Sequence, residues 1–271
     1  AQTNQYPRIT VQPLGSRALL AESGDSFERI LVSIESSAPV GSTGMDPLKT
    51  DQLMTMEGIG ILLDRLAPGG WLGIHRFLLP PPRAEMRLLS TVIESLRQYG
   101  WNPEEHLGVF RTLSTLMVVV SREAWSQEDR VRFVKFCRSL GYATVYYPGM
   151  SPKERNTEIR LPEPVYALGI EQLLQDPLVY HAGTPFDLEP VSDDRPYFDL
   201  FLDLARLKEI RRSLEGKWEG LIEAGLLVPF LFAGVSLIAM LLIGIPMAPY
   251  LRQMKNALQV LIYFVLSLIH I

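Results

Sequence analysis

The sequence is poor in cysteine, since Cys137 is the only one among 271 residues. A single cysteine excludes an internal disulfide and a metal site made of several cysteines, and it is typical of a reducing compartment. Histidine is scarce as well. The four histidines are too scattered along the chain to indicate a metal site: His75, His106, His181 and His270. We therefore expect no bound metal ion.

Long runs of like charge are also lacking. The chain carries 26 basic and 30 acidic residues, for a net charge of -4, and it has no basic stretch of the kind that binds nucleic acid. It contains neither a Gly-x-x-x-x-Gly-Lys-Ser/Thr loop nor a Gly-x-Ser-x-Gly elbow. The sequence therefore argues against a nucleic-acid partner, a P-loop nucleotide hydrolase and an α/β serine hydrolase.

Apolar residues, in contrast, are abundant at 47%. Residues 225–245 (GLLVPFLFAGVSLIAMLLIGI) contain no charged residue, and a helix of this length spans about 30 Å at about 1.5 Å per residue, enough to cross a bilayer core. A second apolar run begins near Ala257. We predict transmembrane helices over 225–271, with the second one truncated and the lipid bilayer as partner. A buried helix in a large soluble core is the alternative.

Basic residues are more frequent before the apolar run than after it. Under the positive-inside rule, residues 1 to about 220 then lie in the cytoplasm. The segment 199–224 has an amphipathic pattern and is predicted to form a juxtamembrane helix with Trp218 near the interface. The basic residues before the run are Arg206, Lys208, Arg211, Arg212 and Lys217, and those after it are Arg252 and Lys255.

The rest of the chain has a mixed α/β pattern. Strand-like and helix-like segments alternate and end in an antiparallel pair, which predicts a doubly wound α/β sheet. Glycines in the sequence APGG (67–70) are expected to end the second helix. The predicted strands are 8–13, 29–34, 71–79, 106–112, 114–121 and 142–148, and the predicted helices are 16–23, 51–66, 83–100 and 126–140.

Glu35 follows the strand 29–34 and precedes a turn of small residues. Ligands of open α/β sheets bind beyond the carboxyl ends of the strands. A carboxylate at such a position could accept a hydrogen bond from a substrate amine or act as a general base. The alternative is a solvated loop glutamate.

Two further candidates have competing interpretations. His75 lies on or next to the strand 71–79 and either faces the cleft or is a core histidine. Asp193, Asp194 and Arg195 could form a salt bridge or a substrate site. We favour a structural role, in which an aspartate caps a helix that begins at Pro196.

The stretches ESSAPVG (35–41) and MTMEGIGILLDRLAPGGWLGIH (54–75) resemble the spermidine synthase family. Its members carry an Asp-Ser-Ser-Asp-Pro turn after a strand, then a helix containing Tyr-Thr, then Leu-x-Pro-Gly-Gly before a strand. The chain is still more similar to bacterial multi-pass membrane proteins with a spermidine-synthase-like domain. The resemblance covers roughly residues 7–205 and includes PPPR (80–83), YPGM (147–150), LPEP (161–164) and PFDLEPVSDDRPYF (185–198).

The resemblance implies a domain organisation. Residues 1–122 would be the C-terminal part of a Rossmann-like methyltransferase-fold sheet, and 123–198 an accessory α/β region of the same domain. The juxtamembrane helix (199–224) and the transmembrane helices (225–271) would follow. In family order the glycine-rich cofactor loop and the ribose-binding acid precede Tyr6. We therefore expect a piece of a longer protein with an incomplete cofactor site, and we expect the last residues, LSLIHI, to be an artefact.

The resemblance also implies roles for particular residues. Glu35 takes the place of the first aspartate of the family's turn and would be the catalytic base, whereas Ala38 replaces the second aspartate, which helps hold the amine. Ser16 replaces an acid near the adenine. The implied cofactor-binding residues are Gly15, Ser16, Arg17 and Ser33, and the implied substrate-binding residues are Ser36, Ser37, Thr55 and His75.

As a whole, the resemblance implies a transferase of the bacterial inner membrane with a cytoplasmic Rossmann domain, forming a homodimer. It would move an aminopropyl or a methyl group from decarboxylated S-adenosylmethionine or S-adenosylmethionine to a polyamine or another small amine. Ser16 and Ala38 stand where the family has acids, and this favours an alternative. In that alternative the Rossmann domain is a catalytically inactive sensor or scaffold attached to a membrane region resembling a transporter.

Overall fold

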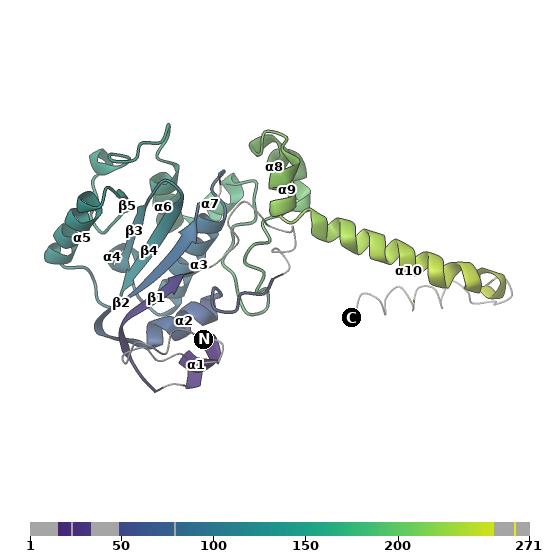
Figure 1. Cartoon of the computed structure of the whole chain (residues 1–271), viewed down its shortest axis with the longest axis horizontal. Helices are drawn as coiled ribbons and strands as arrows, with labels where there is room; N and C mark the ends of the chain where they lie inside the picture. Colours follow the sequence, from purple (N-terminus) through teal and green to yellow (C-terminus); the bar gives the residue numbers. More distant parts are fainter. Residues whose placement is uncertain (1–15, 23, 34–48, 79, 252–262, 264–271) are drawn as a thin grey trace, which may run out of the picture. The chain divides into compact units, whose positions relative to one another are not determined.

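A computed structural model describes residues 16–22, 24–33, 49–78, 80–251 and 263 of the chain (Figure 1). The chain divides into two compact units, Ala1–Gly225 and Leu226–Ile271. The predicted strand at 8–13 and several predicted site residues lie outside the described residues. These site residues are Gly15, Glu35, Ser36, Ser37 and Ala38.

The first unit is built around a five-stranded mixed sheet with the order β1-β2-β4-β3-β5 (Figure 1). β1 and β2 are parallel, and every other neighbouring pair is antiparallel. The α/β class and the antiparallel pair β3–β4 are confirmed, and among the described strands one pair is parallel. The strands are β1 (Phe27–Ser33), β2 (Leu66–Phe77), β3 (Leu107–Arg111), β4 (Thr115–Ser121) and β5 (Ala143–Tyr146).

Helices connect and cover the strands of this unit, and four of them confirm predicted segments: α1, α2, α3 and α5. Gly100, with φ of 74°, follows α3 and ends it as expected for a helix C-terminus. The helices are α1 (Ser16–Glu22), α2 (Met56–Asp64), α3 (Ala84–Gln98), α4 (Pro103–His106), α5 (Gln127–Ser139), α6 (Val165–Gln175), α7 (Pro177–Gly183), α8 (Leu207–Ser213) and α9 (Trp218–Glu223), with 3₁₀ turns η3 (Pro152–Glu154) and η4 (Leu204–Arg206).

Alternating residues of the strands face two different layers of helices. Leu72 and Ile74 of β2 are fully buried, and α3 packs against this strand through its own buried apolar residues. On the other face, Phe110 of β3 contacts Phe133 of α5, with ring centroids 5.9 Å apart. Gly108 lies under the indole of Trp125 on this same face. The core of the unit therefore lies between the sheet and α3, and α5 covers the β3–β5 side of the opposite face.

The second predicted helix is shorter than expected, and its end is not formed by glycine. α2 ends at Asp64, and the N–H of Arg65 donates to the carbonyl oxygens of Ile61 and Leu63. The strand begins at once, because Leu66 pairs with Phe27 of β1. Gly69 and Gly70 therefore lie within β2, so the prediction that they cap the helix is wrong.

The region before the second unit also differs from expectation. No helix begins at Pro196, since residues 193–195 form a turn. The segment 199–224 contains η4, α8 and α9 in place of one continuous helix. Glu215 and Gly216, with φ of 54° and 76°, separate α8 from α9, and this left-handed backbone cannot continue an α-helix.

The second unit contains α10 (Leu227–Leu251). Among the described residues, no helix combines the length and the apolar character needed to cross a membrane. The transmembrane helices over 225–271 therefore stay a prediction.

Replacing Gly108 with alanine should destabilise the first unit. A Cβ at this position would lie 2.5 Å from Cη2 of Trp125, so either the indole or β3 must shift. Overpacking of this kind lowers the free energy of unfolding by about 1–3 kcal/mol, measurable by urea titration followed by circular dichroism. Gly24→Ala is the control, because no atom of the described residues lies within 4 Å of its added Cβ. Equal stability of the two variants would contradict the packing described here.

Candidate functional site

The carboxyl ends of β1 and β2 lie side by side, because the two strands are parallel. Ser33 and His75 are register partners at these ends. Ser33 is exposed, and His75 is half-buried, with its ring packed edge-on against Phe77 at a centroid distance of 5.8 Å. Since the neighbours of His75 along β2 are fully buried on the α3 side, His75 belongs to the opposite sheet face. The structure thus brings two predicted binding residues together at a strand edge that suits ligand binding.

Thr55, a predicted substrate-binding residue, is fully buried as the N-cap of α2. Its hydroxyl oxygen accepts a hydrogen bond of 3.0 Å from the N–H of Gly58. The same hydroxyl lies 2.7 Å from a carboxylate oxygen of Asp193, to which it donates. Both the donor and the acceptor capacity of Thr55 are therefore used within the protein.

Arg17 of α1, a predicted cofactor-binding residue, forms a bidentate ion pair with the carboxylate of Asp193. Its Nη1 and Nη2 atoms lie 2.7 Å and 2.5 Å from the two oxygens of Asp193. Hydrogen bonding to Arg17 lowers the pKa of Asp193, which also accepts from Thr55, and partial burial offsets some of this effect. The pKa of Arg17 is raised by the same pair. Asp193 thus joins α1 to the N-terminus of α2.

The segment that carries Asp193 is fixed to α2 by its backbone. The N–H of Asp193 donates to the carboxylate of Glu57 at 3.0 Å. The N–H of Met56 donates to the carbonyl oxygen of Val191 at 2.8 Å, and that of Asp51 to the carbonyl oxygen of Pro196 at 2.9 Å. Asp193 is therefore a salt-bridging residue, and the helix cap predicted for this aspartate is wrong.

A buried arginine of α3 holds the following part of the same segment. Arg87 donates through Nη1 to the carbonyl oxygens of Phe198 and Leu200, at 3.0 Å and 2.6 Å. Its Nη2 pairs with Asp187 at 2.9 Å. Burial lowers the pKa of Arg87, and the neighbouring Asp187 acts in the opposite direction. Sequence reasoning did not identify Arg87, because its position on α3 has no local pattern that distinguishes it from a surface arginine.

The described residues of the predicted site form two groups. Arg17 and Thr55 are both engaged by Asp193, whereas the side chains of Ser33 and His75 form no hydrogen bond with the described residues. No hydrogen bond or ion pair between described residues joins the two groups. An imidazole and a hydroxyl at the strand ends can bind a polar ligand.

The described residues supply only part of a site for an S-adenosyl group. Ser33 offers a hydroxyl at the end of β1, but the guanidinium of Arg17 is already bonded to Asp193 and to the carbonyl oxygen of Gln52, at 2.8 Å. Ser16 begins α1, and Gly15 lies outside the described residues. Within the described part of the chain, no group of three or more His, Cys, Asp or Glu residues could hold a metal ion.

We expect Asp193→Asn to destabilise the protein at neutral pH by up to about 1 kcal/mol, the range of partly exposed ion pairs. The pKa of Asp193 is lower in the folded than in the unfolded protein. The stabilisation is therefore complete above the ordinary aspartate pKa of about 4 and is lost as the pH falls through the lowered value. Urea titrations between neutral pH and pH of about 3 should show the wild type and the variant converging.

Asp194→Asn is the matched control, since Asp194 is exposed and forms no hydrogen bond or ion pair with described residues. It should leave the free energy of unfolding nearly unchanged at every pH. A loss of stability equal to that of Asp193→Asn would show that negative charge in the loop matters and the ion pair does not.

Comparison with known proteins does not identify a family or a function for this chain. No family model matches the chain, and a search of curated proteins finds no match.

Proposed function

We propose that the chain belongs to a transferase resembling spermidine synthases, and that its sheet is the C-terminal part of a Rossmann-like methyltransferase fold. One observation carries the proposal. β1 and β2 are parallel and set Ser33 opposite His75 at their carboxyl ends, the edge at which open α/β sheets bind ligands. Glu35 follows Ser33 by two residues in the sequence. The motif resemblance in residues 35–41 and 54–75 supports the same function.

In the proposed reaction Glu35 is the general base. S-adenosylmethionine or its decarboxylated form would supply a carbon made electrophilic by a neighbouring sulfonium. The acceptor nitrogen would form a bond to this carbon as the carbon–sulfur bond breaks and the sulfur leaves as a neutral thioether, and the amine would give its proton to the Glu35 carboxylate. Ser36, Ser37 and His75 are proposed to position the amine so that its lone pair points at the reacting carbon.

Ala38 bears on the choice of acceptor. A polyamine carries at least two positive charges, and a site with one carboxylate neutralises only one of them. Methyl transfer needs less from the protein, chiefly placement of the acceptor in line with the reacting carbon. The replacement of an acid by Ala38 therefore favours an acceptor with a single amine over a diamine.

The second candidate function is a Rossmann domain that senses ligands or supports a membrane region without catalysis. A specific observation favours it. Arg17 and Thr55, both predicted to bind ligands, are engaged by Asp193 within the protein. A ligand that used Arg17 would first have to break its ion pair with Asp193, and one that used Thr55 would have to break its hydrogen bond to the same carboxylate.

We further propose that the protein resides in the bacterial inner membrane with its α/β unit in the cytoplasm, and that it forms a homodimer. The uncharged sequence of α10 and the basic residues that precede it support the membrane assignment. The dimer rests on the family resemblance alone.

The catalytic proposal is tested with the full-length protein and labelled cofactors. Decarboxylated S-adenosylmethionine with putrescine, and S-adenosylmethionine with a panel of amines, should yield a labelled product in at least one case. Glu35→Gln should lower the rate by about 10²–10⁴-fold, as expected for loss of a general base. Glu28→Gln is the control, because Glu28 is exposed near the other end of β1. Absence of both turnover and cofactor binding by calorimetry would contradict the transferase and favour the scaffold.

A further inference from the structure

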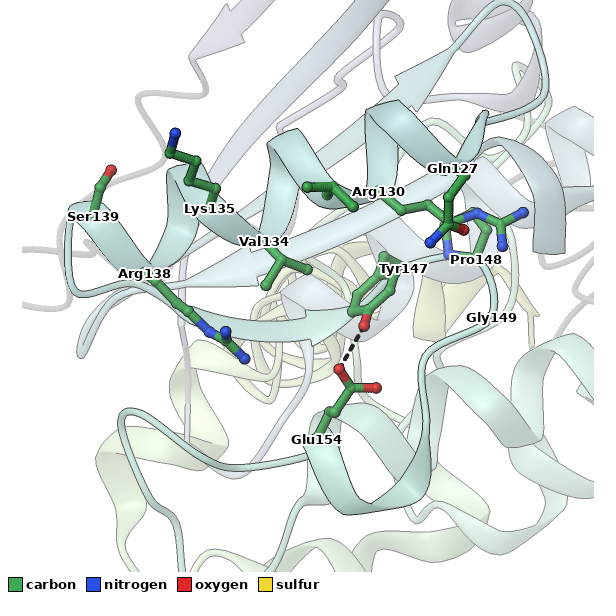
Figure 2. A pocket seen from close by; sticks show the side chains of 11 residues that line it. Gln127, Arg130, Val134, Lys135, Arg138, Ser139, Tyr147, Pro148, Gly149 and Glu154 are labelled. Atoms are coloured by element: carbon green, nitrogen blue, oxygen red, sulfur yellow. Dashed lines mark hydrogen bonds between the residues drawn. The ribbon is translucent and has the colours of Figure 1, made fainter.

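A groove of about 690 Å³ lies between α5 and the segment from the end of β5 to η3 (Figure 2). β5 stands at the opposite end of the sheet from β1, with β4 and β3 between it and β2. At about 4.8 Å per strand, three strand spacings separate this groove from the Ser33–His75 edge by about 14 Å. The groove is therefore a second site, which the proposed transferase function does not use.

The groove is formed by one face of α5 and by the YPGM turn. The lining positions on α5, among them Arg130, Val134 and Arg138, follow one another at helical spacing. The opposite wall includes Tyr147 and Gly149. Gly149 has φ of 75°, and a Cβ there would lie 3.1 Å from Nη1 of Arg130, so glycine lets the turn approach the guanidinium closely.

Positive charge in the groove exceeds negative charge. Arg130, Lys135 and Arg138 line it together with a single acidic residue, Glu154. Glu154 is already occupied, since it accepts from the hydroxyl of Tyr147 at 2.8 Å and from the N–H of Ser151 at 2.9 Å. These two hydrogen bonds lower the pKa of Glu154, so it stays ionised.

The cations themselves are poorly neutralised. Lys135 forms no hydrogen bond or ion pair with the described residues. Among the described residues, Arg138 pairs with the carboxylate of Glu158, at 3.8 Å through Nε, and its two terminal nitrogens form no hydrogen bond there. Arg130 makes one long hydrogen bond of 3.4 Å to the carbonyl oxygen of Trp125. In Figure 2 the side chains of Arg138 and Arg130 lie at opposite ends of the groove, with Val134 and Tyr147 between them.

We propose that this groove binds a small organic phosphate. The lining holds three cations and one carboxylate, and Glu158 outside the lining pairs with Arg138, so an excess of one positive charge remains, which favours an anion such as a phosphate monoester, with its charge of about -2 at neutral pH. The fork of Arg138 offers two parallel donors to the phosphate oxygens. Lys135 adds a positive charge at the rim, with its side chain directed away from Arg138 in Figure 2. Val134 and Pro148 give the organic part an apolar surface. The motif YPGM thus has a binding role beyond its part in the resemblance.

The proposal is tested by titrating the full chain with phenyl phosphate and observing amide chemical shifts of α5 and the YPGM turn. Two matched probes serve as controls. Phenol lacks the charged phosphate, and inorganic phosphate lacks the organic part. Phenyl phosphate should bind at least about tenfold more tightly than phenol, a difference of about 1.4 kcal/mol. Equal affinity for phenol, or binding of a single-stranded oligonucleotide without any binding of phenyl phosphate, would overturn the proposal.

Variants separate a specific site from general attraction. Arg138→Glu and Lys135→Glu should each weaken phenyl phosphate binding at least about tenfold. Arg132→Glu is the matched control, because Arg132 lies on the same helix and pairs with Glu128 at the exposed surface, at 2.5 Å, outside the groove. It brings the same change of charge and should leave the affinity within about twofold. Equal weakening by Arg132→Glu would overturn the proposal, and thermal melting monitored by circular dichroism verifies that each variant is folded.

Discussion

The arrangement of the candidate site depends on the hydrogen bonds and the ion pair formed by the buried guanidinium of Arg87. It bonds carbonyl oxygens of Phe198 and Leu200 and the carboxylate of Asp187, so one buried side chain fixes both ends of the segment 187–200 against α3. A buried charge is unfavourable unless it is paired and hydrogen-bonded. Here the pairing partner and the carbonyl groups come from the same segment, and removal of Arg87 would leave several of them without a donor. If the segment moved away, the buried guanidinium would lose its partners, and this unfavourable state keeps the segment in place.

Asp193 lies within the segment that Arg87 secures, and its position follows from that anchoring. Arg76 of β2 adds a second connection, since it pairs with Asp199 and its guanidinium lies 4.0 Å from the ring centroid of Phe198. With both ends held, the turn that carries Asp193 meets α1 and α2. The ion pair with Arg17 itself is partly exposed and contributes little to stability. A ligand could therefore displace it at modest cost, so the pair is compatible with either proposed function.

The features that could be predicted from the sequence are those whose interacting residues lie close together in the chain. α3 and α5 are predictable because the signals at their ends are local: Gly100 follows α3, and Ser126 forms a capping box with Asp129 at the start of α5. The β3–β4 pair is likewise a short hairpin. Asp193 and Arg17 are 176 positions apart, and no local pattern joins them. The Asp-Asp-Arg-Pro pattern (193–196) locally favours the start of a helix, but tertiary hydrogen bonds hold it in a turn and outweigh that preference.

The two sites also depend on different supports, and this makes their roles separable. The Ser33–His75 edge and Asp193 rest on the β1–β2 pairing and on Arg87, at one end of the strand order. The groove depends on how α5 packs against the sheet. Gly108 has no side chain, so the indole of Trp125, just before the start of α5, can pack directly against β3. Trp125 also donates from its indole N–H to the carbonyl oxygen of His106 at 3.1 Å, which ties the start of α5 to the end of α4, directly before β3. A change that shifts α5 would therefore alter the spacing between Arg138 and the YPGM turn while the hydrogen bonds around Asp193 stay intact.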